Sequence, residues 1–514
     1  MQQQRRFRNR RAQRTVKLLA LLTLLVLATP RLVAQAPGYF YAHQFGVGGG
    51  ISDPIHDRGQ AIVADGAGNV YVTGSFNGTI DFDPGVGVAA LTSTDNPDAF
   101  VAKYDATGAY LWAFRLGATA ATGDGSEGRG IDIDASGNIV VTGAFSGSGD
   151  FDPGPGVATR TTTSQQTFVA KYTDNGGFLW AFVLAAWGPS DVEFDPTGNV
   201  YVVGAFSGTV DFDPGSRTTT LKTISPSTFV AKYSPGGSFT WVRKLGASGK
   251  NADWRTYPNG VSCDATGNVI LCGAFNGTTN LGQGNVSSQG GEDPYVAKYS
   301  ASGSCLWAFS LGGHNSNDVA VDSTGDVYLT GAFSGTVDFD PGAGIAGQTA
   351  GGGVDIYLAK YSAAGVYQWA SGIGGSGSDI AHSVIVDAQD NVLIAGHFTG
   401  TVDFDPGTGV SNVSATAPNA VPYVARYTPV GALDWAFGID GTNGGTASAV
   451  VSAGSGVAVT GYFSGTCDFD HSEGTASLTS AGGVDIFVAG YGQSMLPRVA
   501  KLERAQRSIP PTLD

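Results

Sequence analysis

Residues 39–46 read Tyr-Phe-Tyr-Ala-His-Gln-Phe-Gly and decide the fold of this chain. They match residues 110–117, Tyr-Leu-Trp-Ala-Phe-Arg-Leu-Gly, position by position. Similar segments recur along the chain, but the last repeat, which ends near Tyr491, lacks one. A chain that begins with the piece its last repeat lacks is predicted to close into a ring. Tyr41 then completes a set of seven aromatics with Trp112, Trp180, Trp241, Trp307, Trp369 and Trp435, which we interpret as packing between neighbouring repeats.

Each repeat contains four short strand-like segments and no helical periodicity. In the first copy these are residues 61–64, 70–76 and 99–104 and the segment around Trp112. Seven copies follow one another at intervals of about 58 to 69 residues. Four-stranded sheets repeated radially predict an all-β fold, a seven-bladed β-propeller whose last blade the N-terminal strand completes. An open β-solenoid is the alternative, but it gains nothing from a split repeat.

A turn rich in Asp, Gly and Asn joins the first two strands of each repeat. Its aspartate can accept backbone N–H bonds, and Gly and Asn tolerate positive φ, so we interpret the turn as a hairpin signal. The aspartates are Asp65, Asp134, Asp195, Asp264, Asp322 and Asp387, with Ser452 assigned to this place in the seventh copy.

Three segments of the first copy resemble the SBBP repeat, a bacterial seven-bladed β-propeller repeat. They are Val-Thr-Gly-x-Phe at 72–76, Asp-x-x-Gly-Asn-Val-Tyr at 65–71 and Phe-Val-Ala-Lys-Tyr at 100–104. The resemblance covers about residues 37–493. It implies a secreted or surface-associated propeller, and it supplies no catalytic residues because the family is defined by its structural pattern.

The two ends of the chain differ from the repeats. Residues 1–36 combine a basic start, an apolar run and a small-residue cleavage site, which predicts a secretory signal peptide cut after Ala34. The apolar run of about 11 residues is too short for a membrane anchor. We therefore expect an exported protein, in the extracellular space, on the cell surface or in the periplasm. The propeller is predicted over 37–493 and a short tail over 494–514, with no transmembrane span after cleavage.

The charge excludes one class of partner. The chain carries a net charge of -15, and removing residues 1–36 takes away eight positive charges and no negative ones, which leaves -23. Such acidity disfavours nucleic acid, whose recognition requires basic patches. We expect a monomer with a protein or carbohydrate ligand. The four cysteines, Cys263, Cys272, Cys305 and Cys467, are interpreted as small residues and not as a disulfide framework.

The most suggestive motif is Asp-Phe-Asp-Pro-Gly, between the second and third strands. In a strand this spacing puts both carboxylates on one side. One hypothesis is a calcium site in each blade, because paired carboxylates suit a hard cation. The alternative is structural: the acids cap the turn and pair with a basic residue. The candidate acids are Asp81, Asp83, Asp150, Asp152, Asp211, Asp213, Asp338, Asp340, Asp403, Asp405, Asp468 and Asp470, and the fourth copy has Asn280-Leu281-Gly282 instead. The candidate basic partners lie on the third strand: Lys103, Lys171, Lys232, Lys298, Lys360 and Arg426.

Two tryptophans break the repeat. Trp187 and Trp254 stand in the loops before the third and fourth blades, the second of them close to Arg255 and Tyr257. Aromatic side chains that occur once, in neighbouring loops, are candidates for stacking on a carbohydrate or peptide. The alternative is that they fold over a blade edge.

Catalytic motifs are missing from the sequence. The histidines His43, His56, His314, His382, His397 and His471 show no metal-ligand spacing. Three of them, His56, His314 and His382, are assigned to loops that could converge at the ring centre. We interpret the protein as an exported, non-catalytic binding or interaction scaffold. The alternatives are a calcium-stabilised surface or adhesion scaffold, and a polysaccharide hydrolase or lyase with its site in the central funnel.

Overall fold

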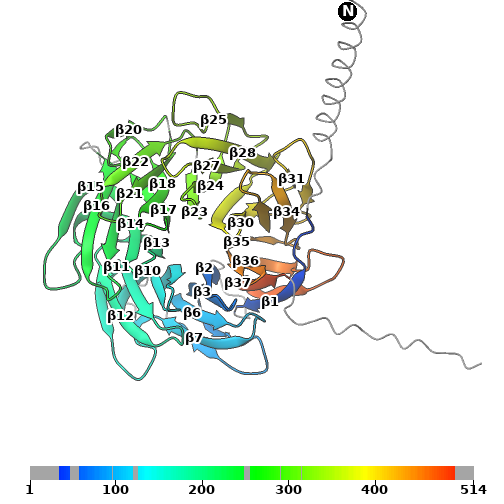
Figure 1. Cartoon of the computed structure of the whole chain (residues 1–514). Coiled ribbons are helices and arrows are strands. Elements are labelled where there is room, and N and C mark those ends of the chain that lie inside the picture. The colour runs from blue at the N-terminus through cyan, green and yellow to red at the C-terminus, as the bar shows by residue number, and fades with distance from the viewer. Residues whose placement is uncertain are drawn as a thin grey trace, which may run out of the picture.

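The computed structural model describes residues 34–46, 57–94, 97–119, 125–247, 255–289, 291–313 and 315–492. Within these ranges the chain forms strands and no helix, and hence nothing long and apolar enough to cross a membrane as a helix. Seven four-stranded antiparallel units surround a common axis (Figure 1). The predicted all-β, seven-bladed propeller is confirmed. Most of the predicted signal peptide, the tail 494–514 and Trp254 lie outside the described residues.

Each blade is built from four main strands, which follow one another from the axis outward. Blade one holds β2 (Arg58–Ala64), β3 (Val70–Phe76), β6 (Asp98–Tyr104) and β7 (Tyr110–Leu116). Blade two holds β9 (Ser126–Ile133), β10 (Ile139–Asp150), β11 (Thr159–Tyr172) and β12 (Phe178–Leu184). Blade three holds β13 (Gly188–Phe194), β14 (Val200–Asp211), β15 (Thr220–Tyr233) and β16 (Phe239–Ala247). Blade four holds β17 (Thr256–Cys263), β18 (Val269–Phe275), β21 (Asp293–Tyr299) and β22 (Cys305–Ser310); blade five, β23 (Asn315–Val321), β24 (Val327–Phe333), β27 (Asp355–Tyr361) and β28 (Tyr367–Gly375). Blade six holds β29 (Ile380–Val386), β30 (Val392–Phe398), β33 (Val421–Tyr427) and β34 (Leu433–Gly438); blade seven, β35 (Gly444–Ala453), β36 (Gly456–Asp468), β37 (Ser477–Tyr491) and β1 (Tyr39–Phe45). The short strands are β4 (Thr79–Asp81), β5 (Ala90–Thr92), β8 (Ala118–Thr119), β19 (Thr278–Asn280), β20 (Asn285–Ser287), β25 (Thr336–Asp338), β26 (Gly347–Thr349), β31 (Thr401–Asp403) and β32 (Asn412–Ser414).

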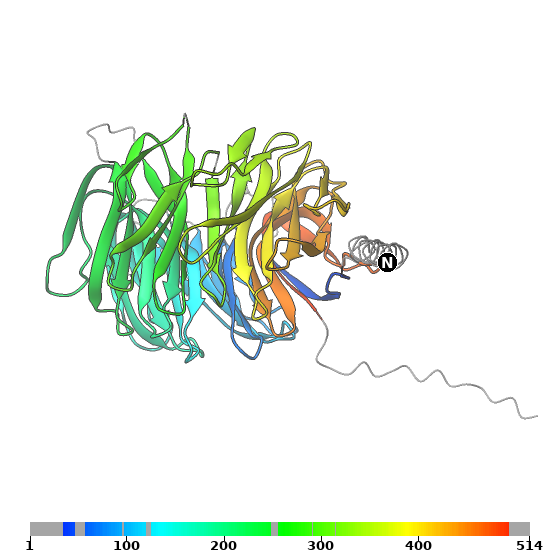
Figure 2. The ribbon, with the colours of Figure 1, turned by 45° about the horizontal axis from the view of Figure 1, so that its top comes forward.

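The N-terminal strand closes the ring as predicted. Strand β1 pairs antiparallel with β37, in a register that sets Tyr41 opposite Gly490 and Phe45 opposite Ile486. Figure 2 shows the blue N-terminal strand beside the orange strands of the seventh blade. Both Tyr41 and Phe45 are buried, so the closing strand also contributes apolar packing. Ring closure therefore combines backbone hydrogen bonds with burial of aromatic side chains.

The core lies between the blades. The innermost strands contact one another around the whole ring, with β2 touching β9 on one side and β35 on the other. Every residue of β3 and β6 is buried, as expected for strands covered on both faces. Each apolar cluster joins two neighbouring blades; Phe182 of blade two, for example, packs with Phe206 and Phe212 of blade three. Because a sheet of four strands buries neither face alone, every blade depends on both neighbours.

The connection between the second and third strands is a hairpin that reaches the preceding blade. In blade four it forms β19 and β20, and β19 pairs with β16 of blade three. In blade six, β31 pairs with β28 of blade five in the same way. The phenylalanine of each Asp-Phe-Asp motif is buried, and in blade one its carbonyl, at Phe82, accepts a 3.1 Å hydrogen bond from the Tyr104 hydroxyl. These hairpins cover outer strand edges that would otherwise be free to pair with other chains.

Two smaller expectations have different outcomes. The cysteines are all free, and Cys263 pairs in the ladder with Val269 while Cys272 pairs with Val296, so the absence of a bridge between them is confirmed. The place assigned to Ser452 is wrong. Ser452 pairs with Val457, as Ala64 pairs with Val70, so it lies inside β35, Ala453 takes the place of the turn aspartate, and the connection is one residue shorter.

Deleting residues 37–46 removes the fourth strand of the last blade. We expect the whole domain to lose stability, with a melting temperature lower by about 10 °C or more, because two buried aromatics and a ladder of hydrogen bonds are lost together. Circular dichroism or calorimetry measures the transition. Gly38→Ala is the control, since an added Cβ there meets open space. A truncated chain that melts at the wild-type temperature would show that β1 does not hold the ring closed.

Candidate functional site

Three of the four residues predicted for the aromatic site, Trp187, Arg255 and Tyr257, lie together at the joint between blades three and four. Trp187 directly precedes β13, and its ring centroid lies 6.2 Å from that of Tyr257 in β17, with the planes at 76°. Arg255 is exposed, and its Nη1 donates to the Tyr257 hydroxyl at 3.4 Å. Trp187 is 40% exposed, which is unusual for a tryptophan in this ring. An exposed indole beside a guanidinium can receive a ligand by stacking and by hydrogen bonding.

Hydrogen bonds hold the backbone next to the two aromatic side chains, at Ala186 and at Arg255. The carbonyl of Ala186 accepts hydrogen bonds from the backbone N–H and the hydroxyl of Thr167, at 2.7 and 3.0 Å. The N–H of Arg255 donates to the Asn276 side chain at 2.6 Å, and Asn276 N–H donates back to the Arg255 carbonyl at 3.0 Å. Ala186 and Arg255 are therefore both anchored to neighbouring segments by hydrogen bonds. The ligand-binding role of Trp187, Arg255 and Tyr257 stays a prediction.

The Asp-x-Asp acids cap their own hairpin. In blade one, Asp81 Oδ1 accepts the N–H groups of Asp83, at 3.1 Å, and Ala89, at 2.7 Å, and Asp83 Oδ1 accepts Gly85 N–H at 2.8 Å. The same bonds recur in the other five copies of the motif. Among the described residues no group of three or more His, Cys, Asp or Glu could hold a metal ion. Calcium binding by these acids stays a prediction.

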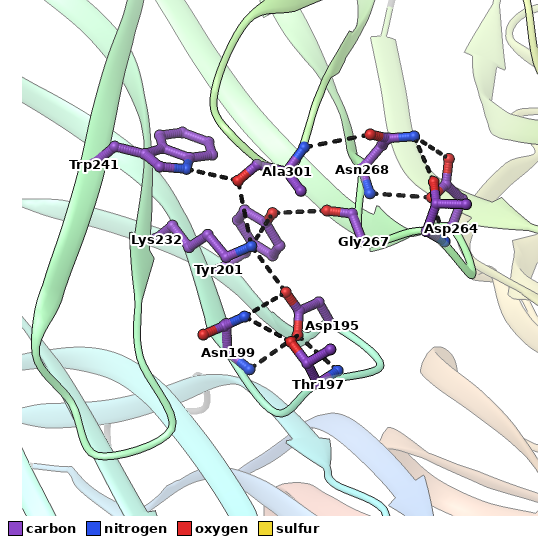
Figure 3. Close-up of polar contacts among 11 residues, drawn as sticks. Asp195, Thr197, Asn199, Tyr201, Lys232, Trp241, Asp264, Gly267, Asn268 and Ala301 are labelled. Atoms are coloured by element: carbon purple, nitrogen blue, oxygen red, sulfur yellow. Dashed lines mark hydrogen bonds and ion pairs between the residues drawn. The ribbon is translucent and has the colours of Figure 1, made fainter.

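The third-strand lysine binds a different acid from the one suggested by the sequence, so the proposed pairing with Asp-x-Asp is wrong. Lys232 Nζ lies 2.9 Å from Oδ2 of Asp195, the aspartate in the first turn of its own blade (Figure 3). No ion pair found in the described part of the chain involves an Asp-x-Asp acid. The equivalent pairs are Lys103–Asp65 at 3.9 Å, Lys171–Asp134 at 2.8 Å, Lys298–Asp264 at 2.9 Å, Lys360–Asp322 at 3.1 Å and Arg426–Asp387 at 3.1 Å.

This ion pair belongs to a network that crosses the joint between blades, which we call the inter-blade lock. In Figure 3, Lys232 Nζ and Trp241 Nε1 both donate to the carbonyl of Ala301 in the next blade, at 3.4 and 3.0 Å. The lock is thus a turn aspartate, a lysine, a tryptophan and one carbonyl of the following blade. It confirms the tryptophans as inter-blade packing. The other tryptophan bonds are Trp112 to Asp174 at 3.2 Å, Trp180 to Pro235 at 3.1 Å, Trp307 to Ala363 at 3.1 Å and Trp369 to Pro429 at 3.3 Å.

The lock shifts the acidity of its aspartate. Burial alone would raise the pKa of Asp195, but hydrogen bonds from Asn199, Lys232 and Thr197 outweigh it and lower the pKa to about 2. The carboxylate therefore stays ionised at neutral pH beside the lysine.

In blade seven Gly490 replaces the lysine, since a Cβ there would collide with the ring of Tyr41.

Acidic side chains on the innermost strands were missed by the sequence reasoning. Asp132 of β9 accepts the N–H of Phe194 in the next blade at 2.7 Å. Asp318 of β23 accepts the N–H of Val384 in the next blade at 2.8 Å, and Asp191 of β13 accepts that of Val261 at 3.2 Å. An innermost strand has no ladder partner on its axial side, so these carboxyls satisfy N–H groups that would otherwise be unpaired.

These carboxyls hold protons unusually tightly. Each is surrounded by protein near the axis of the ring, although water still reaches part of it. Burial raises the pKa of Asp318 to about 7 and that of Asp132 to about 6. Burial and neighbouring acids raise the pKa of Asp191 and of Glu193 well above the usual range. Asp318 and Asp132 are therefore partly protonated near neutral pH.

A pocket beside Asp132 and Glu193 has a volume of about 650 Å³ and spans blades two to four. Asp132, Glu193 and Cys263 line it, together with the lock residues Lys171 and Asp195. Burial raises the pKa of the Cys263 thiol far above its ordinary value, so the thiol is not activated as a nucleophile.

Of the three histidines assigned to loops, His382 lies within the described residues, and it stands in a strand. His382 lies in β29 and its Nε2 is 3.1 Å from Nδ1 of His397 in β30, so its assignment to a loop is wrong. Burial lowers the pKa of His382 to about 3, and it also lowers the pKa of His397. Both imidazoles are therefore neutral near pH 7. His56 and His314 lie outside the described residues.

Comparison with known proteins gives distant similarities. No family model matches the chain. It is 24% identical over 430 residues to an uncharacterized WD repeat-containing protein, L264, of Acanthamoeba polyphaga mimivirus. That match covers 67% of this chain and 30% of the relative, so the chain spans less than a third of that protein.

Among solved structures, the β-propeller domain of Cps50 (Swd1) from Myceliophteria thermophila is 8% identical, with a TM-score of 0.39 over 87% of this chain and 99% of that one. A PL25 ulvan lyase bound to -[GlcA(1-4)Rha3S]- is 13% identical, with a TM-score of 0.42 over 90% of this chain and 98% of that one. Similarities this distant carry no argument about activity.

The lock generates a prediction about coupling. Replacing Lys232 by Met or Asp195 by Asn should each lower the free energy of unfolding by about 3 kcal/mol, because breaking a buried ion pair leaves one group uncompensated. The double variant should lose less than the sum of the two. Denaturant titration measures all three, with Lys222→Met, an exposed lysine of the same strand, as control. Strictly additive losses would show that the two groups do not interact.

The inner acids generate a prediction about pH. Asp132 and Asp318 bind protons more tightly in the folded chain than in the unfolded chain, where a carboxyl titrates near 3.8. The contribution of these two acids to the free energy of unfolding should therefore fall as pH rises from about 4 to 8, through both folded-state pKa values, whereas His382, whose pKa is lowered from 6.5 to about 3, contributes in the opposite direction. Asp318→Asn should reduce this slope by up to about 1.4 kcal/mol per pH unit. Thermal melts across pH 4–8 test it, with the exposed Glu292→Gln as control; an unchanged slope would contradict it.

Proposed function

We propose that this protein is a non-catalytic interaction module that captures a protein ligand on the end of the ring that carries Trp187, Arg255 and Tyr257. The observation that carries the proposal is the exposure of Trp187 beside Tyr257, in a ring whose repeated tryptophans lie in the inter-blade joints. Trp, Tyr and Arg are the residue types enriched at the energetic centres of protein interfaces.

The scaffold gives physical support to this role. Ala186 and Arg255 are held by hydrogen bonds to neighbouring segments, so ordering this part of the backbone costs little conformational entropy when a ligand binds. The mimivirus relative is named a WD repeat-containing protein, and WD40 repeats build propellers that share this radial architecture. Export to the cell exterior and stabilisation by calcium are further parts of the proposal, and both come from the sequence.

A polysaccharide hydrolase or lyase is the second candidate, because one observation favours it. Asp132 and Glu193, two carboxyls with raised pKa, line the pocket of about 650 Å³. Pairs of carboxyls with separated pKa values are the usual machinery of glycoside hydrolysis. However, Asp132 already accepts the backbone N–H of Phe194 at 2.7 Å, which gives it a structural role. We therefore prefer the binding module.

The proposed site makes a direct prediction. Labelled protein is screened on peptide and glycan arrays, and the affinity for the strongest ligand is then measured by calorimetry. Trp187→Ala and Tyr257→Ala should each weaken binding at least about ten-fold, as loss of an interface anchor does. Ile224→Ala, at an exposed apolar residue of a blade-three hairpin, is the matched control and should bind normally.

The outcomes separate the candidate functions. All three variants should melt at the wild-type temperature, because none of these side chains is part of a lock. Ligand binding that survives both aromatic substitutions would remove this site from the proposal. Cleavage of an arrayed polysaccharide, abolished by Glu193→Gln, would favour the enzyme instead.

A further inference from the structure

The joint between blades five and six buries two carboxyls that belong to different blades. Asp355 begins β27 of blade five and is 4% exposed, and Asp379, directly before β29 of blade six, is fully buried. Burial raises the pKa of Asp379 and the charge of Asp355 adds to this, so the two carboxyls lie close enough to interact. Among the described residues neither carboxyl forms an ion pair, so no basic side chain balances their charge.

The joint between blades one and two shows how such a carboxyl can be balanced. Asp98 begins β6 as Asp355 begins β27, and Nη1 of Arg115 binds Asp98 Oδ2 at 2.7 Å. In the two ladders, Arg115 and Gly372 take the same place relative to these aspartates. Blade five therefore keeps the aspartate but has a glycine where blade one has the arginine.

Hydrogen bonds satisfy the two carboxyls only in part. Asp379 accepts the backbone N–H groups of Thr399 and Gly375, at 3.0 and 2.9 Å. Asp355 Oδ2 accepts the N–H of Gly351 at 2.6 Å, but its Oδ1 is buried and has no hydrogen-bond partner among the described residues. A buried carboxyl oxygen without a donor requires either a proton or a bound cation.

A second unpartnered oxygen faces the same joint. The hydroxyl of Tyr423 in β33 is buried and makes no hydrogen bond within the described ranges. Its counterpart in blade four, Tyr295, reaches Thr228 Oγ1 of the preceding blade at 3.1 Å. Blade five has Ile356 in the register of Thr228, directly after Asp355, and Tyr423 packs in one apolar cluster with it. The Tyr423 hydroxyl therefore faces the chain beside Asp355 without the partner that its counterpart has.

Backbone oxygen atoms lie beside these groups, because glycines leave room for them. A Cβ added to Gly351 would lie 3.3 Å from the carbonyl oxygen of Gly375 and 3.6 Å from Asp355 Oδ2. A Cβ added to Gly374 would collide with the Asp355 carboxyl. Carboxylate, carbonyl and hydroxyl oxygens together are the ligands of a hard cation. Calcium accepts such a set in flexible geometry, whereas magnesium usually keeps several waters, for which a buried joint has little room.

We propose that the joint between blades five and six binds one calcium ion, with Asp355, Asp379 and the Tyr423 hydroxyl as its side-chain ligands. The carbonyl of Gly375 is the nearest backbone ligand. The double charge of the ion balances two carboxylates, as the arginine balances one carboxylate between blades one and two, and the ion ties the two blades together. The site contains no Asp-x-Asp acid and lies outside the proposed interaction site, so it is independent of both.

Calcium titration of the full chain tests the proposal. After removal of bound metal with EDTA, calcium at about 100 times its dissociation constant should raise the melting temperature by about 3 °C. Calorimetry should show one equivalent of calcium that is lost, or bound at least about ten-fold more weakly, in Asp355→Asn and in Asp379→Asn. A chain carrying both Asp338→Asn and Asp340→Asn, in the hairpin of the same blade, should keep this equivalent.

Tyr423→Phe is the finer test, because it removes one oxygen and no charge. It should weaken calcium binding about five-fold, as expected for the loss of one polar contact. Tyr357→Phe is the matched control, since its hydroxyl is also buried and unpartnered in the described part of the chain, but it packs against blade four. An equal loss of affinity in Tyr357→Phe would overturn the assignment of Tyr423.

The remaining outcomes decide between an ion and a proton. Wild-type protein that shows no response to calcium would overturn the proposal, as would an equivalent of calcium that persists in both aspartate variants. If the two carboxyls are simply protonated, Asp355→Asn should melt at or above the wild-type temperature with calcium and with EDTA, and this result would also overturn it. Loss of the calcium response only in the Asp338→Asn and Asp340→Asn chain would assign the ion to the hairpin instead.

Discussion

Backbone groups at the edges of a four-stranded sheet must find partners, and this constraint organises the whole molecule. The antiparallel pairing of β1 with β37 satisfies these backbone groups in blade seven, where the N-terminal strand meets the last strand of the repeats. Every other blade receives its fourth strand from a covalent turn. Each blade packs on two neighbours, so the stability of all seven blades depends on the pairing of β1 with β37, the one junction made without a covalent turn.

The backbone groups at the inner and outer edges of the sheets are satisfied in different ways. On the outside, hairpins such as β19–β20 add strands to the preceding blade. Around the axis there is no room for another strand, so single carboxyls bind the free N–H groups instead. Asp132 and Asp318 reach the next blade in this way. A carboxyl in that position is poorly hydrated, which explains why the same residues that seal the inner edge have raised pKa values.

The fold could be predicted from the sequence because its determinants repeat. The strands recur in all seven copies, and a tryptophan recurs in six of them with Tyr41 in its place in the seventh, so a single architecture accounts for every copy. The partner of the lysine could also have been predicted from the sequence, because the lysine and the turn aspartate are kept or lost together. Blade four keeps Lys298 and Asp264 without the Asp-x-Asp acids, and blade seven has Gly490 and no turn aspartate. The inner acids could not be predicted from the sequence, because each occurs in only one or two copies. Each also binds a backbone N–H of the next blade, and the repeat pattern carries no information on contacts between blades.

Repetition also separates structural residues from candidate binding residues. A side chain present in nearly every blade has seven equivalent environments, and the locks and hairpin caps account for these positions. A ligand is asymmetric relative to such a ring, so its recognition must come from residues that occur once. Trp187, Tyr257 and Arg255 occur once, and they meet at one joint on fixed strand ends. The same joint carries Asp191, which ties the two inner strands together beside them. The proposed binding site and a local reinforcement of the scaffold therefore coincide between blades three and four.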